Sequence, residues 1–171
     1  MFRKQALVFV GMAGAVIVLA VLWSHMSRLP LPLPDGDDVP ARLAFVVHWL
    51  LFPGLCLLAG IAMVANRRFF LSSAIDGTRT PESPSLEINL RYNQNTLEQT
   101  VLAAIAWAGL SLALPHERLS LIPALACMFV VGRVLFWIGY LIAPWARAVG
   151  FALTFYPTVA ALVWLSFRAF A

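Results

Sequence analysis

The ten residues 90–99, LRYNQNTLEQ, begin a long apolar run and place charge at the mouth of an apolar helix. Arg91, Asn95 and Glu98 are spaced i, i+4 and i+7, so on a helix they lie within about 60° of one another. Charged side chains at a membrane boundary are costly unless they meet each other or a polar ligand. We therefore expect the other apolar segments to form walls around this polar stripe.

The composition around this stretch is that of an integral membrane protein. The chain has 171 residues, is 61% hydrophobic and 12% charged, and has a mean hydropathy of +0.85. Soluble domains are about 45–50% apolar and about 25% charged. The net charge of +4 is spread over loops and helix ends, which argues against nucleic acid as a partner. Cys56 and Cys127 lie inside apolar segments, which argues against a disulfide framework and a metal site.

Five apolar segments divide the chain into two predicted units. The first segment, 6–23, is longer than the apolar core of a usual signal peptide and lacks a small-residue cleavage site, so a retained helix is favoured over that alternative. With the Pro-rich acidic connection after it, this helix forms an N-terminal unit, residues 1–40, ahead of a four-helix domain, residues 41–171. The four later spans are expected at 43–65, 88–114, 119–142 and 148–170, with a polar loop at 72–84.

Basic residues are divided unequally between the two ends of these spans. If the N-terminus is cytoplasmic, seven basic residues lie at cytoplasmic ends and four at the opposite ends, in agreement with the positive-inside rule. We therefore expect a multi-pass protein of a bacterial inner membrane with a cytoplasmic N-terminus. The seven are Arg3, Lys4, Arg67, Arg68, Arg79, Arg91 and Arg147, and the four are Arg28, Arg42, Arg118 and Arg168.

In this orientation Arg91, Glu98, Tyr140 and Arg147 reach the same, cytoplasmic, side. An excess of positive charge around one carboxylate suits a small zwitterion with more carboxylates than amines. Arginines would hold the carboxylates of such a ligand, and Glu98 would hold its amine. The residues alone leave open a structural interpretation, in which Arg91 and Glu98 pair on one helix and Arg133 pairs with Glu98 from a neighbouring helix.

The spacing of these residues resembles the MAPEG superfamily, the membrane-associated proteins of eicosanoid and glutathione metabolism. The basic pair Arg67-Arg68 also matches a pair that closes the first family helix, and the resemblance covers residues 43–171. The motifs that carry it are Arg91-x-x-x-Asn95-x-x-Glu98, Gly132-Arg133 followed by Gly139-Tyr140, and Arg147 before the last span.

The resemblance implies an all-α membrane fold, an antiparallel four-helix transmembrane bundle plus one extra N-terminal transmembrane helix, assembled as a homotrimer. It implies glutathione as a co-substrate, bound between subunits without a metal. The residues implied to hold glutathione are Arg67, Arg91, Asn93, Asn95, Glu98, Arg133 and Tyr140. Arg147 is implied as the catalytic residue, because a cation within about 4–6 Å of an acid such as a thiol lowers its pKa by about 1–3 units.

The activity that the resemblance implies is a glutathione-dependent transferase or peroxidase, in which the thiolate attacks a lipophilic electrophile in the bilayer. The alternative is a non-catalytic membrane protein of the same fold that binds a lipid or serves assembly, because fold does not fix function. Phe136 stands where the leukotriene-forming member has a tyrosine, which removes one hydroxyl from the implied thiol pocket. Transport is disfavoured, because the polar residues cluster at one membrane face and transporter sites lie near the midplane.

Overall fold

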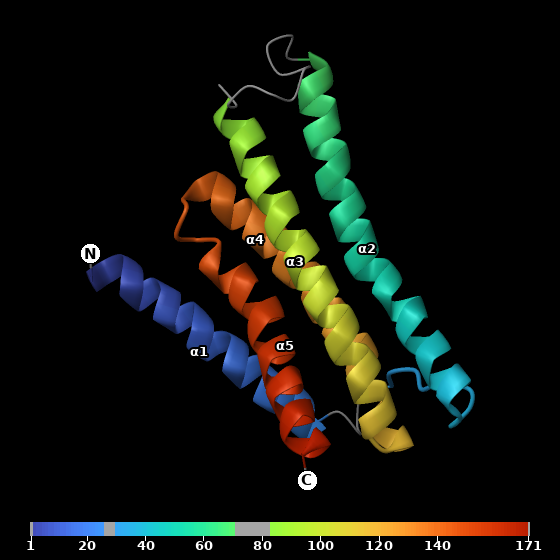
Figure 1. Cartoon of the computed structure of the whole chain (residues 1–171). Coiled ribbons are helices and arrows are strands. Elements are labelled where there is room, and N and C mark those ends of the chain that lie inside the picture. Colours follow the sequence, from blue (N-terminus) through green and yellow to red (C-terminus); the bar gives the residue numbers. More distant parts are fainter. Residues whose placement is uncertain (1, 26–29, 71–82, 171) are drawn as a thin grey trace.

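The computed structural model describes residues 2–25, 30–70 and 83–170, and all of the regular structure in them is helical. Helices α2 to α5 run alternately up and down as a bundle, and α1 lies obliquely against the α5 side (Figure 1). The predicted four-helix bundle with an extra N-terminal helix is therefore confirmed. The elements are α1 (Phe2–His25), α2 (Val39–Phe70), α3 (Pro84–Ala113), the 3-10 turn η3 (His116–Arg118), α4 (Leu121–Ile142) and α5 (Ala148–Ala169).

The later helices are long and apolar enough to cross a bilayer. In the described residues this holds for α2, α3, α5 and the stretch His116–Ile142, while α1 contains a shorter apolar stretch, Phe9–Val18. The protein is therefore an integral, multi-pass membrane protein. Most of the predicted loop at 72–84 lies outside the described residues, as do Arg28 and Arg79 of the charge count.

The main core lies between α3 and α4. Ala103 and Ala106 of α3 are fully buried, and Trp107 of α3 meets Phe129 of α4 edge to face with ring centroids 6.4 Å apart. Helix α4 is the most enclosed of the spans and α2 the least. Helix α2 instead exposes a row of large apolar side chains, as a lipid-facing helix does: Leu43, Val47, Leu51, Leu55, Leu58 and Ile61.

Glycines let α4 and α5 cross in backbone contact. A Cβ on Gly150 would overlap the backbone N of Phe136 and the carbonyl O of Gly132. Lipid is as apolar as a leucine side chain, so membrane helices associate by close packing of small residues instead of by hydrophobic burial. This crossing brings the middle of α4 against the first turns of α5, where the candidate site is built.

Two arginines satisfy carbonyl groups at the C-terminal end of α3. Arg42 of α2 donates through Nη1 to the carbonyl O of Leu114 at 2.8 Å, and Arg168 of α5 donates through Nη1 to that of Ala113 at 2.9 Å. Asp37 accepts a hydrogen bond from Arg42 Nε at 3.0 Å. Cations favour the negative end of a helix dipole, so this end of α3 is fixed by the helices on both sides.

Replacing Gly150 by alanine tests the α4–α5 crossing. We expect Gly150→Ala to lower the free energy of unfolding by about 1–3 kcal/mol, because the added methyl overlaps backbone that cannot move away. Gly54→Ala in α2 is the matched control, since nothing lies within 4 Å of a Cβ there. The control gains at most about 1 kcal/mol from helix propensity. Thermal unfolding in detergent measures both, and equal midpoints would contradict the close crossing.

Asp37, in the connection before α2, makes the stability of the fold depend on pH. Arg42, and after it His116, holds the pKa of the Asp37 carboxyl below its ordinary value of 3.8. A depressed pKa stabilises the fold above the unfolded pKa, and the gain is lost as the pH falls through the folded pKa. We therefore expect Asp37→Asn to melt below wild type at neutral pH, and the difference to shrink as the pH falls below about 4 and to vanish only below the lowered pKa of the folded state. Melting curves with Asp35→Asn as control measure this, and a difference that grows on acidification would contradict it.

Candidate functional site

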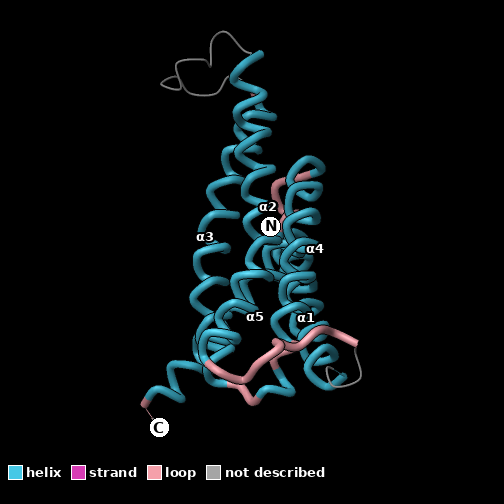
Figure 2. The backbone as a smooth tube through the Cα atoms, turned by 90° about the vertical axis from the view of Figure 1, so that its right-hand side faces the viewer, coloured by secondary structure: helices cyan, strands magenta, loops and turns pink. Residues whose placement is uncertain are grey.

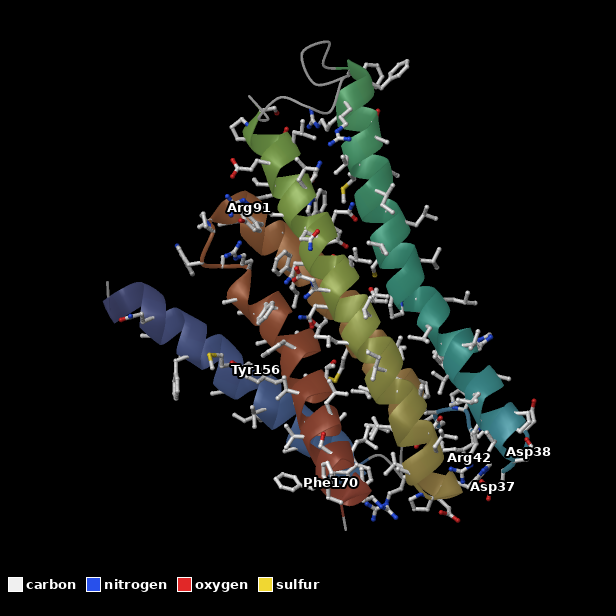
Figure 3. The ribbon with its side chains drawn as sticks, viewed as in Figure 1. Asp37, Asp38, Arg42, Arg91, Tyr156 and Phe170 are labelled. Carbon is white, nitrogen blue, oxygen red and sulfur yellow. The ribbon has the colours of Figure 1, made fainter. Side chains whose placement is uncertain are left out.

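A polar pocket lies where α3 passes the turn between α4 and α5. Its volume is about 430 Å3, within the range of small-molecule sites. Helices α2 and α3 extend beyond α4 and α5 at this end of the bundle (Figures 1 and 2). Figure 3 shows that Arg91 lies toward this end, whereas Asp37 and Arg42 lie at the opposite end of the bundle. The lining residues are Arg91, Asn95, Phe136, Pro144, Trp145, Arg147, Ala148 and Phe151.

The sequence of the α4–α5 turn determines where Arg147 lies. Helix α4 ends at Ile142, before Pro144, and a Cβ on Gly139 would lie 2.6 Å from the carbonyl O of Ala146, so the turn folds directly over the end of α4. Arg147 then begins α5 as its N-cap residue. Its guanidinium carbon lies 4.6 Å from the ring centroid of Tyr140, which is a cation–π contact.

Arg91 approaches the same tyrosine from α3. It interacts electrostatically with Tyr140 and forms an ion pair with Glu87 one turn earlier, with Nη2 2.6 Å from Oε1. More than half of each side chain in that pair is exposed, so the pair contributes little to stability. Arg91 and Arg147, which both line the pocket, therefore share Tyr140 as a neighbour.

Arg133 lies behind the pocket and is fully buried, with 0% of the residue exposed. It donates through Nη1 to Asn95 Oδ1 at 2.7 Å and through Nη2 to Thr154 Oγ1 at 2.7 Å. Its guanidinium carbon also lies 4.8 Å from the centroid of the Phe136 ring. A buried charge is tolerated when it is hydrogen bonded, so α3, α4 and α5 are joined by these bonds.

Glu98 lies apart from the arginines with which the sequence suggested pairing. It is exposed on α3 and accepts a hydrogen bond from Gln94 Nε2 at 2.9 Å. Arg91 pairs with Glu87 and Arg133 with Asn95, so both pairings considered for Glu98 are wrong for the described side chains. Asn95 and Glu98 are 60° apart on the helix, which is enough for one to face α4 and the other to face outward.

Two further predicted residues lie away from the pocket. Asn93 faces α2, where its Oδ1 would lie 3.0 Å from a Cβ on Gly60. Arg67 is exposed near the end of α2. Of the predicted site residues, the structure thus brings together five in one chain, namely Arg91, Asn95, Arg133, Tyr140 and Arg147.

Sequence reasoning missed several residues of this site. Thr154 accepts from Arg133, and Trp145 and Phe151 line the pocket. Thr154 stands seven residues after Arg147 and so shares its helix face, a spacing that could have identified it. The aromatic walls gave no such signal, because phenylalanine and tryptophan occur throughout the spans other than that of α3.

The chain is similar to known membrane proteins. A model of the MAPEG family matches residues 44–167. Transmembrane protein 79 from Bos taurus and from Mus musculus are each 26% identical to it over 163 residues, which is 94% of this chain and 41% of each relative. The chain thus spans less than half the length of these curated relatives. No solved structure matches the chain.

A threonine pair on α5 tests the bonding of the buried arginine. We expect Thr154→Val to lower the free energy of unfolding by about 1.5–3 kcal/mol, since the substitution removes an acceptor from a buried charge without changing volume much. Thr158→Val is the control, because the Thr158 hydroxyl donates only within its own helix in the described contacts, to the carbonyl O of Thr154. Chemical denaturation in mixed micelles compares the two, and equal losses would contradict the role of Thr154.

Proposed function

We propose that this chain, which belongs to the MAPEG family, is a glutathione-dependent transferase or peroxidase that activates the thiol of glutathione for attack on lipophilic electrophiles. One observation carries the proposal. Arg91, Arg147 and Asn95 line a single pocket with aromatic walls, and none of the described lining residues carries a carboxylate. The pocket therefore favours an anionic ligand of small-molecule size.

Glutathione suits this arrangement by its charge. It carries two carboxylates and one amine, and a guanidinium binds a carboxylate through two parallel hydrogen bonds. Asn95 adds a directional contact, because its Oδ1 accepts from Arg133 and this fixes the end of the amide that is available to a ligand. The buried Arg133 thus acts on the ligand by orienting Asn95.

Arg147 is proposed to stabilise the thiolate. A cation close to a thiol lowers its pKa, so the proton is released to solvent and more thiolate is present at neutral pH. The thiolate then forms a C–S bond with the electrophile as the leaving group departs with its electron pair. With a hydroperoxide it attacks the terminal oxygen instead, so the O–O bond breaks, the alcohol leaves after taking a proton, and the sulfenic acid formed reacts with a second glutathione to give the disulfide and water. Phe136, Phe151 and Trp145 supply apolar walls for an electrophile that arrives from the bilayer.

Some predicted glutathione-binding residues lie outside the pocket of their own chain, and a homotrimer would bring them to the pocket of a neighbouring chain. We propose a homotrimer in which Arg67 and Glu98 of one chain complete the glutathione site of a neighbour, and the exposed position of both side chains supports this. Asn93 faces α2 of its own chain and has no part in this arrangement. The pocket end would face the cytoplasm together with the N-terminus, because Arg67, Arg68, Arg91 and Arg147 gather there. The named relatives are mammalian, and a bacterial inner membrane stays a prediction.

A second candidate is a non-catalytic member of the family that keeps the pocket for an anionic lipid or for assembly. It is favoured by the engagement of Arg133 in structural bonds and by Phe136, which brings no hydroxyl to the pocket. Both candidates keep the basic pocket and therefore both predict binding of an anion. Only the first predicts turnover of an electrophile or a hydroperoxide.

Glutathione titration tests the proposal. We expect the purified protein to bind glutathione by calorimetry, and Arg147→Ala to lower the bound thiolate fraction at pH 7 by about 8- to 30-fold. A thiol with a pKa near 8.5 is about 3% ionised at this pH, and a pKa lower by 1–3 units raises that fraction to between about one quarter and nearly all. The ultraviolet absorbance of the thiolate measures that fraction, and the glutathione affinity should change less. Arg168→Ala, at the other end of α5, is the matched control and should change neither.

The outcomes separate the candidates. Absence of glutathione binding at millimolar concentration would sink the transferase and peroxidase proposal. Binding without turnover of chlorodinitrobenzene or a lipid hydroperoxide would support the non-catalytic candidate instead.

A further inference from the structure

A second hollow lies between α1, α4 and α5. Its volume is about 420 Å3, nearly that of the polar pocket, but no charged side chain lines it among the described residues. We call it the α1 groove. Its lining residues are Val18, Leu31, Ala124, Cys127, Met128, Val131 and Leu153. All of them are apolar, and the thiol of Cys127 is a weak hydrogen-bond donor at most.

The sequence of α1 explains why a groove forms there. Gly11, Ala15 and Val18 are spaced i, i+4 and i+7 and share one face. A Cβ on Gly11 would lie 2.9 Å from Val149 of α5, and Ala15 is buried, so α1 touches the bundle through small residues. Because α1 crosses obliquely (Figure 1), the groove opens at Val18. Leu31, in the connection after α1, lines it as well.

The position of the groove along α4 places it within the hydrocarbon core of the bilayer. Ala124, Cys127, Met128 and Val131 share one face of α4 and lie 3 to 10 residues after its first residue, which is about 5–15 Å along the axis. The hydrocarbon core of a bilayer is about 30 Å thick, so this depth lies among the acyl chains of the leaflet at that end. An unfilled apolar hollow loses the dispersion contacts of its walls, so a chain that fills it is favoured.

The groove is separate from the polar pocket. Phe151 lines the pocket and Leu153 lines the groove. Residues i and i+2 of a helix point about 200° apart, so these two side chains face different sides of α5.

The comparisons treat α1 differently. The family match begins at residue 44, whereas the alignment with transmembrane protein 79 covers 94% of the chain and so takes in most of α1. The groove therefore depends on an element outside the matched family region.

We propose that the α1 groove binds one acyl chain of a phospholipid from the leaflet that surrounds the N-terminal half of α4. The bound chain fills the space between α1 and the bundle and joins α1 to it. This binding does not depend on glutathione or on the proposed activity.

Native mass spectrometry from mild detergent tests the proposal with two valines of α4. Val131 lines the groove, and Val134, one turn later, is similarly exposed, at 49% against 53%, but is not among the lining residues. We expect the wild type to retain one phospholipid per chain. Val131→Trp should lower that retention at least about tenfold, since the indole takes the place of the chain. Val134→Trp should retain lipid as the wild type does.

Cys127 supplies a second readout, with Cys56 of α2 as its control. We expect delipidation to raise the labelling rate of Cys127 by an apolar maleimide more than that of Cys56. Equal retention in the two tryptophan variants would overturn the proposal. So would a retained free fatty acid in place of a phospholipid, or a Cys127–Cys127 cross-link between two copies, which would mean that a second chain covers the groove.

Discussion

The structure depends on one buried charge. Arg133 has no solvent exposure in the interior of a membrane bundle, and its hydrogen bonds reach Asn95 of α3 and Thr154 of α5. Leaving such a group unpaired in hydrocarbon costs far more than leaving a methylene poorly packed. Helices that associate in lipid have little hydrophobic drive to choose one arrangement, so the pairing of this guanidinium selects one. The glycine-mediated crossing of α4 and α5 makes that pairing geometrically possible.

The cations of the site thus divide into two kinds. Arg133 is enclosed and serves the fold, whereas Arg91 and Arg147 line a pocket. There Arg91 is held by the exposed carboxylate of Glu87, and Arg147 lies against the ring of Tyr140. Asn95 belongs to both sets, because it bonds the enclosed arginine and also lines the pocket. A substitution at Asn95 should therefore alter both stability and the proposed ligand binding, while one at Arg147 should act mainly on the proposed ligand. Variants at these positions can therefore distinguish an effect on the stability of the fold from an effect on the proposed ligand.

Much of this arrangement could be predicted from the sequence. Hydropathy and the Pro-rich connections located the later spans to within a few residues, and the motif around Arg133, Tyr140 and Arg147 predicted residues that the structure brings together. The direction of Glu98 could not be predicted, because a 60° arc on a helix is compatible with two different neighbours. The capping of α3 by Arg42 and Arg168 and the oblique course of α1 depend on how helices far apart in the chain pack. No local pattern reports such packing.

The bonding of Arg133 also bears on how the chain enters the membrane. Helix α4 is synthesised before α5, so its guanidinium enters the lipid before Thr154 and the carbonyl of Gly150 are available to it. Asn95, on the earlier helix α3, offers an acceptor during that interval. Integration of α4 and α5 as a hairpin would shorten the time for which the cation is incompletely solvated. The last helix thus supplies two of the acceptors of Arg133, and a chain that stops ahead of α5 leaves this guanidinium with Asn95 alone among its described hydrogen-bond partners.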